Sequence, residues 1–276
     1  MSAIRLDGKV LSEEIKLDVK RRVAEVGAPT LAVVLVGNDP ASAVYVSGKK
    51  KACEFTGIRS LSYELSADTS EDELLKLVDD LNARSDVDGI LVQLPLPKHI
   101  NEDKVLLRIY PEKDVDAFHP YNVGMLSIGR PIFKPCTPAG VIELIKKSGA
   151  TISGKNCVVV GRSNIVGKPV SMLLLAENGT VTTCHSRTAN LREVCANADI
   201  LVAALGKPRF ITADMIKENS VVIDVGIHRM ENNKLCGDVD FDACKEKAGF
   251  ITPVPGGVGP MTIAMLMRNC LEAHMR

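Results

Sequence analysis

Strand-like and helix-like segments alternate along almost the whole chain. In the first half, residues 30–36 (TLAVVLV) and 89–94 (GILVQL) are continuous apolar runs that end in turn-forming residues. Between them, Ser70 and Glu73 have the capping-box spacing that starts a helix, and an earlier helix is expected over about residues 10–26. Strands that alternate with helices in this way are typical of parallel sheets, whose strands are buried on both faces.

A second series of the same kind follows a segment rich in proline and glycine, residues 110–138. Its expected strands and last helix are residues 156–161, 180–184, 199–204, 221–225 and 260–273. Because proline and glycine interrupt regular structure, we place a domain boundary in this segment. We predict an α/β fold with two domains, residues 1–118 and 119–276, each built on a mostly parallel sheet, with a cleft between them. The last helix, from about residue 260, could pack back on the first domain.

Length and charge narrow the possible functions. The chain has 276 residues, which is enough for about two domains. Its 34 lysines and arginines are balanced by 34 aspartates and glutamates, so it lacks the positive surplus typical of nucleic-acid binding. Its apolar runs are far shorter than the roughly 20 residues that span a bilayer, and the N-terminus has no signal-peptide pattern. We therefore expect a cytoplasmic protein with neither a nucleic-acid nor a membrane partner.

The eight cysteines include no Cys-x-x-Cys pair, and the five histidines have no metal-ligand spacing. Small buried thiols are the usual explanation for cysteines in apolar runs. We expect no metal site and interpret the histidines as structural or solvated.

Residues 161–169 (GRSNIVGKP) lie between an expected strand and an expected helix. A glycine turn in this position can receive a pyrophosphate, because free backbone N–H groups and the helix dipole favour an anion. The turn departs from the G-x-G-x-x-G pattern, with Ser163 at the second glycine position and one extra residue before the last glycine. A plain strand-to-helix turn is therefore an equally good interpretation.

The end of the next strand bears on the choice of cofactor. An NAD site would carry an acid there for the ribose hydroxyl, whereas this chain has residues 184–188 (CHSRT). Ser186, Arg187 and the upstream Arg162 offer hydrogen-bond donors and positive charge, as a 2′-phosphate requires. The pattern favours NADP over NAD, although Arg187 alone is better explained as a solvated surface residue.

In the first half, Tyr45 and Lys49 are four residues apart at the expected start of a helix, so they share one helix face. The next apolar strand ends at Gln93, and ligands of such folds bind at the carboxyl ends of parallel strands. Gln93 and Lys49 could meet there, although a solvated lysine over a packed ring is the simpler explanation of the helix pair alone. Asp114 and Asp116 put two carboxylates in the boundary segment, where loop capping is an equally good interpretation.

With these residues identified, the chain resembles the bifunctional methylenetetrahydrofolate dehydrogenase/cyclohydrolase family over essentially its full length. The motifs are YVSGKKKACEFTGI (45–58), VQLPLP (92–97), PEKDVDAFHP (111–120), PCTPAG (135–140), VVVGRSNIVGKP (158–169), TVTTCHSRT (180–188), VIDVGI (222–227) and TPVPGGVGPMT (252–262). One departure is Ala117, where the family usually has glycine, and we expect only a local effect from it.

The resemblance implies a role for each candidate residue. Lys49 would be the acid/base residue of the cyclohydrolase step, Gln93 would hydrogen-bond it, and Tyr45 would stack near the folate. Asp116 would bind the amino-pyrimidine edge of the pterin, with Pro255 and Gly256 lining the folate. The implied NADP contacts, in a Rossmann-like C-terminal domain, are Thr137, Gly161, Arg162, Ser163, Ser186, Ala204, Ile227, Gly259 and Thr262. The resemblance also implies a homodimer.

The implied reaction is NADP-dependent oxidation of methylenetetrahydrofolate to methenyltetrahydrofolate, followed by hydrolysis to 10-formyltetrahydrofolate. Both steps belong to one-carbon folate metabolism, which serves purine biosynthesis. A monofunctional dehydrogenase of the same family is disfavoured because Lys49 and Gln93 are both present. A non-catalytic module that senses NADP or folate would be favoured by loss of Lys49, Asp116 or the PGGVGP loop, and all three are present.

Overall fold

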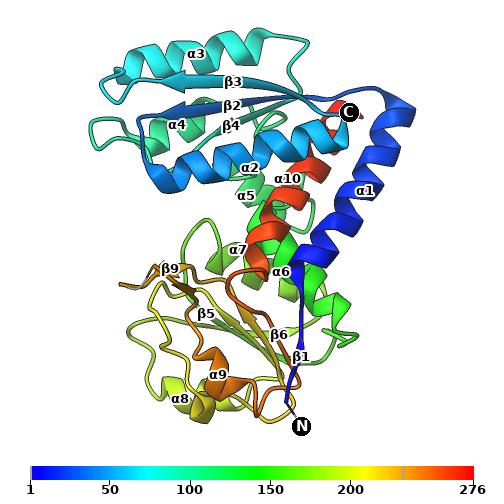
Figure 1. Cartoon of the computed structure of the whole chain (residues 1–276), viewed down its shortest axis with the longest axis vertical. Coiled ribbons are helices and arrows are strands. Elements are labelled where there is room, and N and C mark those ends of the chain that lie inside the picture. Colours follow the sequence, from blue (N-terminus) through cyan, green and yellow to red (C-terminus); the bar gives the residue numbers. More distant parts are fainter. Residues whose placement is uncertain (1, 232) are drawn as a thin grey trace. The chain divides into compact units, whose positions relative to one another are not determined.

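The structure is a computed structural model and describes residues 2–231 and 233–276. The chain, drawn in Figure 1, divides into two compact units. Unit 1 comprises the N-terminal residues through Ser12 together with Thr137–Thr262, and unit 2 comprises Glu13–Cys136 and Ile263–Arg276. The division falls after Cys136 rather than at residues 118 and 119, and it places the residues up to Ser12 with the second half. The grouping of Ile263–Arg276 with the first half agrees with the expectation for the last helix.

The sheet of unit 2 has three parallel strands in the order β3-β2-β4. The strands and the helices around them are α1 (Gly8–Val26), β2 (Thr30–Val36), α2 (Pro40–Thr56), β3 (Arg59–Leu65), α3 (Glu71–Ala83), β4 (Gly89–Val92), α4 (Glu102–Arg108) and α5 (Pro120–Ser127). β2 lies in the middle, and all its residues are buried, as its apolar run predicts. α2 and α3 cover opposite faces of this sheet (Figure 1). The capping box of Ser70 and Glu73 is present at the start of α3.

Three elements of unit 2, which are β3, α4 and α5, have no counterpart among the elements expected from the sequence. β3 has the sequence RSLSYEL, which alternates polar and apolar residues because this strand is partly exposed, unlike β4 at the other edge of the sheet. α5 lies inside the segment that was interpreted as an irregular boundary. Its first residue is Pro120, where a missing N–H costs nothing, and the His119 side chain accepts a hydrogen bond from the backbone N–H of Tyr121. Proline here starts a helix rather than preventing one.

Unit 1 contains a six-stranded sheet in the order β1-β11-β8-β7-β5-β6, and every neighbouring pair is parallel. Its elements are β1 (Ile4–Arg5), α6 (Cys136–Lys147), β5 (Asn156–Val160), α7 (Gly167–Ala176), β6 (Thr180–Cys184), α8 (Leu191–Ala196), β7 (Ile200–Ala203), a 3-10 turn (Ala213–Met215), β8 (Val221–Asp224), the β9 (His228–Arg229) and β10 (Leu235–Cys236) hairpin, α9 (Phe241–Cys244) and β11 (Phe250–Ile251). The last helix, α10 (Val258–His274), begins in unit 1 and belongs to unit 2 from Ile263 on. From β5 the chain moves outward to β6 and then returns to β7 on the other side of β5. Such a change of direction leaves a crevice for ligands at the carboxyl ends of the strands.

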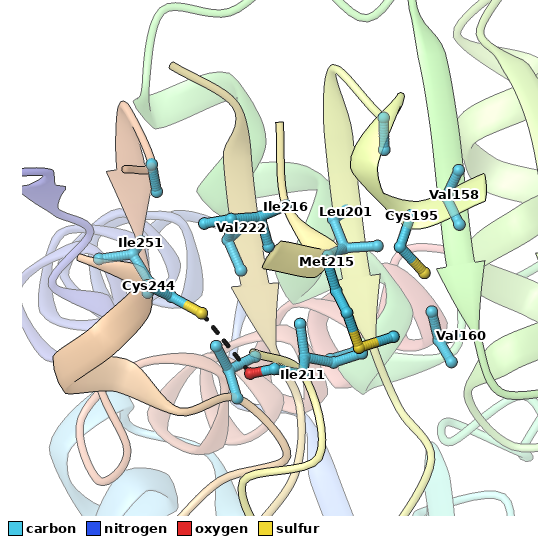
Figure 2. Close-up of a cluster of buried hydrophobic side chains, with 14 of the residues drawn as sticks. Val158, Val160, Cys195, Leu201, Ile211, Met215, Ile216, Val222, Cys244 and Ile251 are labelled. Carbon is cyan, nitrogen blue, oxygen red and sulfur yellow. Dashed lines mark hydrogen bonds between the residues drawn. The ribbon is translucent and has the colours of Figure 1, made fainter. Parts of the chain in front are cut away.

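One hydrophobic cluster of unit 1 lies against one face of this sheet, whose central strands are buried on both faces. Figure 2 shows Val158, Leu201 and Val222, from three adjacent strands, beside Ile211 and Met215 from the segment that follows β7. All eight cysteines are free thiols and buried, which the sequence predicts for the several that lie in apolar runs. In the described part of the chain, no helix is both long enough and apolar enough to cross a membrane.

Candidate active site and cofactor site

Lys49 and Gln93 meet in unit 2. Lys49 lies on α2 with only 6% of its surface exposed, and its Nζ donates a hydrogen bond of 2.9 Å to Gln93 Oε1. Gln93 follows β4 directly, and its backbone N–H continues the sheet by bonding Val34 O at 2.8 Å. Its Nε2 donates to Leu94 O at 2.7 Å, which turns the other end of the amide, the oxygen, toward the lysine. The predicted contact between these two side chains is confirmed.

Tyr45 lies one helical turn before Lys49, in the interior of α2 rather than at its start, because the helix begins at Pro40. Its ring is 37% exposed. Burial of the rest of the side chain raises the pKa of its hydroxyl group above the ordinary value. A ring that is half in contact with protein and half exposed can offer a face to a flat ligand.

The two carboxylates of the boundary segment differ in environment. Asp114 is buried and accepts hydrogen bonds from His119 N at 2.7 Å and Asn122 Nδ2 at 2.9 Å. Burial raises the pKa of Asp114 to about 6. It therefore caps the loop, as one interpretation predicted.

Asp116 is only half-buried. The Cys136 thiol donates a hydrogen bond of 3.4 Å to Val115 O, the carbonyl just before Asp116. Burial first, and then the charge of Asp116, raises the pKa of that thiol well above its ordinary value, while the positive charge of Lys49 acts in the opposite direction. Both charges also act on the Cys270 thiol. Lys49 and Asp116 are thus close to the same buried thiols, and the structure brings Lys49, Gln93 and Asp116 into one region.

Asn269 of α10 supports this region and was not predicted. Its side chain is buried, and Nδ2 donates to Val115 O at 2.8 Å and to Lys134 O at 2.9 Å. The first of these bonds holds the carbonyl that immediately precedes Asp116. A lone asparagine on the apolar face of the last helix is the sequence signal that could have identified it. Ala117, on the other side of Asp116, has a left-handed φ of 59°, which costs a non-glycine residue about 1 kcal/mol.

Pro255 and Gly256 lie in unit 1, in the loop between β11 and α10, so their predicted place beside the folate stays a prediction. Pro255 is exposed, and Gly256 has a left-handed φ of 103°. The carbonyl of Gly256 accepts hydrogen bonds from Gly8 N at 2.9 Å and Lys9 N at 3.2 Å. The loop is therefore fixed to the start of α1.

The turn after β5 depends on its two glycines. A Cβ on Gly161, whose φ is 139°, would lie 2.0 Å from Ala204 O, and a Cβ on Gly167 would lie 2.2 Å from Gly161 O. Ser163 Oγ accepts hydrogen bonds from Val166 N at 3.2 Å and Gly167 N at 3.3 Å. The serine therefore closes the turn that leads into α7, which gives its presence at a usual glycine position a structural reason.

Arg162, Ser163, Ser186 and Arg187 are all exposed near the ends of two neighbouring strands. Arg162 follows β5 by two residues and Ser186 follows β6 by two residues. Because β5 and β6 are adjacent and parallel, these ends lie at the same edge of the sheet. Their donors and positive charges suit a phosphate group, and the site could hold the 2′-phosphate of NADP.

The remaining predicted cofactor residues also belong to unit 1. Ala204 and Ile227 follow β7 and β8, so four parallel strands end at predicted cofactor residues. Thr137 Oγ1 and Thr262 Oγ1 are 2.9 Å apart, within hydrogen-bond distance. A Cβ built on Gly259 would lie 3.6 Å from Ile227 Cδ1, so these two residues are neighbours.

One unit therefore has the parallel sheet and glycine turn of a dinucleotide-binding protein, and the other has a buried lysine held by a glutamine. The chain belongs to the tetrahydrofolate dehydrogenase/cyclohydrolase family. The family's catalytic domain matches residues 6–116, and its NAD(P)-binding domain matches residues 135–276. This confirms the resemblance inferred from the motifs.

Individual relatives cover nearly the whole chain. Bifunctional protein FolD of Agathobacter rectalis is 63% identical over 275 residues, which are 98% of this chain and 99% of the relative. The crystal structure of the FolD methylenetetrahydrofolate dehydrogenase/cyclohydrolase of Campylobacter jejuni superposes with a TM-score of 0.96 at 47% identity, and the match covers 99% of both chains. The Trypanosoma brucei dehydrogenase-cyclohydrolase, solved with NADP and an inhibitor, has a TM-score of 0.95 at 39% identity, over 100% of this chain and 98% of that one.

Proposed function

We propose that this chain is an NADP-dependent methylenetetrahydrofolate dehydrogenase that also hydrolyses the methenyl product to 10-formyltetrahydrofolate. The full-length identity to bifunctional FolD proteins supports both activities. The hydrogen bond of 2.9 Å between the buried Lys49 and Gln93 is the observation that carries the second one, because a dehydrogenase alone does not need it.

The oxidation depends on how the substrate and the cofactor are positioned, and no side chain has to take up a proton. A hydride leaves a carbon that is flanked by two nitrogens, whose lone pairs stabilise the resulting cation, and NADP accepts the hydride when it is bound. The exposed donors at the ends of β5 and β6 fit this cofactor, because Arg162, Ser186 and Arg187 offer positive charge and hydrogen bonds where a phosphate would lie.

The hydrolysis does require protons to move. Water adds its oxygen to the methenyl carbon and releases a proton. The new hydroxyl then loses its proton as the carbonyl forms, one carbon–nitrogen bond breaks, and the freed nitrogen gains a proton. We infer that Lys49 moves these protons and that Gln93 holds its Nζ in place.

The other roles follow from the same arrangement. Asp116 accepts hydrogen bonds from the amino-pyrimidine edge of the folate, and the exposed part of the Tyr45 ring stacks against it. Pro255 and Gly256 line the folate. Thr137, Gly161, Arg162, Ser163, Ser186, Ala204, Ile227, Gly259 and Thr262 contact NADP. The enzyme acts in the cytoplasm as a homodimer, without a nucleic-acid or membrane partner.

Two assays on the wild-type protein test this function. With methylenetetrahydrofolate and NADP, absorbance of the methenyl product should appear and then decay, and NADP should be preferred over NAD. With methenyltetrahydrofolate alone, hydrolysis should exceed the buffer rate. Binding of NADP without turnover would instead identify a sensing module, and oxidation without enzyme-dependent hydrolysis would identify a monofunctional dehydrogenase.

A further inference from the structure

Two buried carboxylates lie beside the predicted cofactor loops of unit 1. Asp224 ends β8, and Asp238 follows β10; they are 3% and 0% exposed. Asp224 Oδ1 accepts hydrogen bonds from Gly226 N and Asp238 N, both at 2.9 Å, and Oδ2 accepts one from Val239 N at 2.9 Å. Burial first, and to a smaller extent the charge of Asp238, raises the pKa of Asp224 to about 6. The end of β8 is therefore attached to the segment after β10, which carries Asp238.

The packing around this pair excludes side chains. A Cβ on Gly237 would lie 1.9 Å from Asp224 Oδ2, and a Cβ on Gly226 would lie 2.5 Å from the Asp238 carboxyl carbon. Both glycines therefore allow backbone to approach a carboxylate closely enough for its N–H groups to bond it. Such an arrangement is rigid, because any larger residue at either position forces the carboxylates away.

Asp238 binds the loop after β7 as well. Oδ2 accepts hydrogen bonds from Leu205 N at 2.7 Å and Gly206 N at 3.1 Å, and Oδ1 accepts one from Lys207 N at 2.9 Å. Three consecutive backbone N–H groups are thus held by one carboxylate. The residue before them is Ala204, whose carbonyl lies against Gly161 in the turn after β5.

The fourth partner of Asp238 is His228, with 2.7 Å between Nε2 and Oδ1. An ionised carboxylate only accepts, so the histidine nitrogen donates. His228 directly follows Ile227, the predicted cofactor contact after β8, and its side chain is 21% exposed. The sequence pattern indicates only a structural or solvated histidine at this position, and nothing in the proposed chemistry uses it.

We propose that Asp238 and His228 are positioning residues for NADP, which hold the loops after β7 and β8 in the conformation that binds the cofactor. The proposal rests on the proposed function, because that function places Ala204 and Ile227 against NADP. A loop that is already held by charge-assisted hydrogen bonds loses little conformational entropy when a ligand binds, so releasing it weakens binding.

His228 allows the test, because it is partly exposed and can be replaced without opening the core. His228→Leu removes the donor, whereas His228→Gln places an amide N–H at a similar distance from the backbone. The dissociation constant of NADP is measured by calorimetry, and KM for NADP and kcat are measured for the dehydrogenase. Hydrolysis of methenyltetrahydrofolate without NADP is measured in parallel.

We expect His228→Leu to raise both the dissociation constant and KM for NADP about tenfold, with kcat within a factor of about two. His228→Gln should restore wild-type values, and NADP-free hydrolysis should be unchanged in both variants. His99→Leu is the matched control, because it removes a histidine of unit 2 whose Nε2 contacts Thr69 O, and it should leave NADP binding unchanged. Wild-type NADP binding by His228→Leu, or equal loss in both His228 variants, would overturn the proposal. Failure of the wild type to oxidise its substrate would instead overturn the proposed function.

Discussion

The two units hold their candidate functional groups in opposite ways. In unit 2, the lysine itself is buried and directly hydrogen-bonded to Gln93. In unit 1, the candidate phosphate ligands are exposed, and the buried polar groups, such as Asp238, bind backbone N–H groups instead. A group that moves a proton needs a fixed partner and little water, whereas a site for a charged cofactor needs shaped backbone and accessible donors. Single substitutions should therefore have large effects in unit 2 and small, distributed effects at the exposed residues of unit 1.

The largest effect is expected from Lys49→Met. The variant keeps an unbranched side chain of similar length but has no group that can carry a proton. Hydrolysis of methenyltetrahydrofolate should fall by about 10² to 10⁴, the range typical of lost acid–base catalysis, while NADP-dependent oxidation persists. The loss of hydrolysis and the retention of oxidation are measured as initial rates of both reactions on the same folded preparation of the variant.

Lys50→Met is the matched control for that prediction. Lys50 is the next residue on α2 and forms a partly exposed ion pair with Glu64 at 2.7 Å. Its replacement should leave both rates close to wild type. Hydrolysis at the wild-type rate by Lys49→Met would remove the assigned role and, with it, the contrast between the units.

The sequence predicts the fold best where burial is complete. β2, β7 and β8 are buried throughout, and each begins and ends within one residue of its expected strand. β6 is also where it was expected although it is mostly exposed, because its run is β-branched. The edge strand β3 was missed because its alternating pattern follows partial exposure rather than a continuous apolar run. The helix α5 was missed because proline was interpreted as a breaker, when its position at the first turn makes it a starter.

The candidate site residues also differ in how far the sequence predicts them, for the same physical reason. Lys49 and Gln93 could be paired from the sequence because both lie near regular elements whose ends meet at one edge of a parallel sheet. The partners of Asn269 and Asp238 could not be predicted, even though Asn269 itself stands out on an apolar helix face, because each side chain binds the backbone of loops that are distant in sequence. The hydrogen bonds of an unpredicted loop leave no periodic signal. Distinguishing Asp114 from Asp116 likewise required knowing which of the two carboxylates is buried.

A second prediction concerns pH and the buried Asp114. Its pKa is about 6 in the folded protein, against 3.8 ordinarily, because burial opposes the charged form. Between pH 4 and 6 the folded chain therefore keeps a proton that the unfolded chain has released, so this group lowers stability as pH rises through that window. The difference between the two pKa values corresponds to a change of about 3 kcal/mol in the contribution of Asp114 to the free energy of unfolding. Relative to Asp114→Asn, which does not titrate, the wild type should lose about that much unfolding free energy between pH 4 and pH 7.

Urea unfolding of both proteins at several pH values measures this difference. Asp86 is the control, because its pH dependence of stability should have the opposite sign. Its hydrogen bond to Arg84 lowers its pKa to about 2. The stabilisation from Asp86 should be present above about pH 4 and disappear as pH falls toward 2. A wild-type advantage over Asp114→Asn that stays constant or grows from pH 4 to 7 would contradict the prediction. It would also mean that the buried carboxylate of unit 2 is better solvated than its contacts indicate.

The smallest effect is expected at the exposed edge of unit 1, from Arg162→Ala. If Arg162 binds the 2′-phosphate, its loss should lower the ratio of kcat/KM with NADP to kcat/KM with NAD by about tenfold, which corresponds to about 1.4 kcal/mol. The effect is modest because Arg162 is exposed and water screens its charge. Arg192→Ala is the matched control, because Arg192 is an exposed arginine of the same unit that pairs with Asp214 at 2.7 Å. Steady-state rates with each cofactor measure the ratio, which the control should leave unchanged. An equal loss with NADP and NAD would show that Arg162 supports the turn after β5 without distinguishing the two cofactors, and the phosphate site would then have to be sought at Ser186 and Arg187.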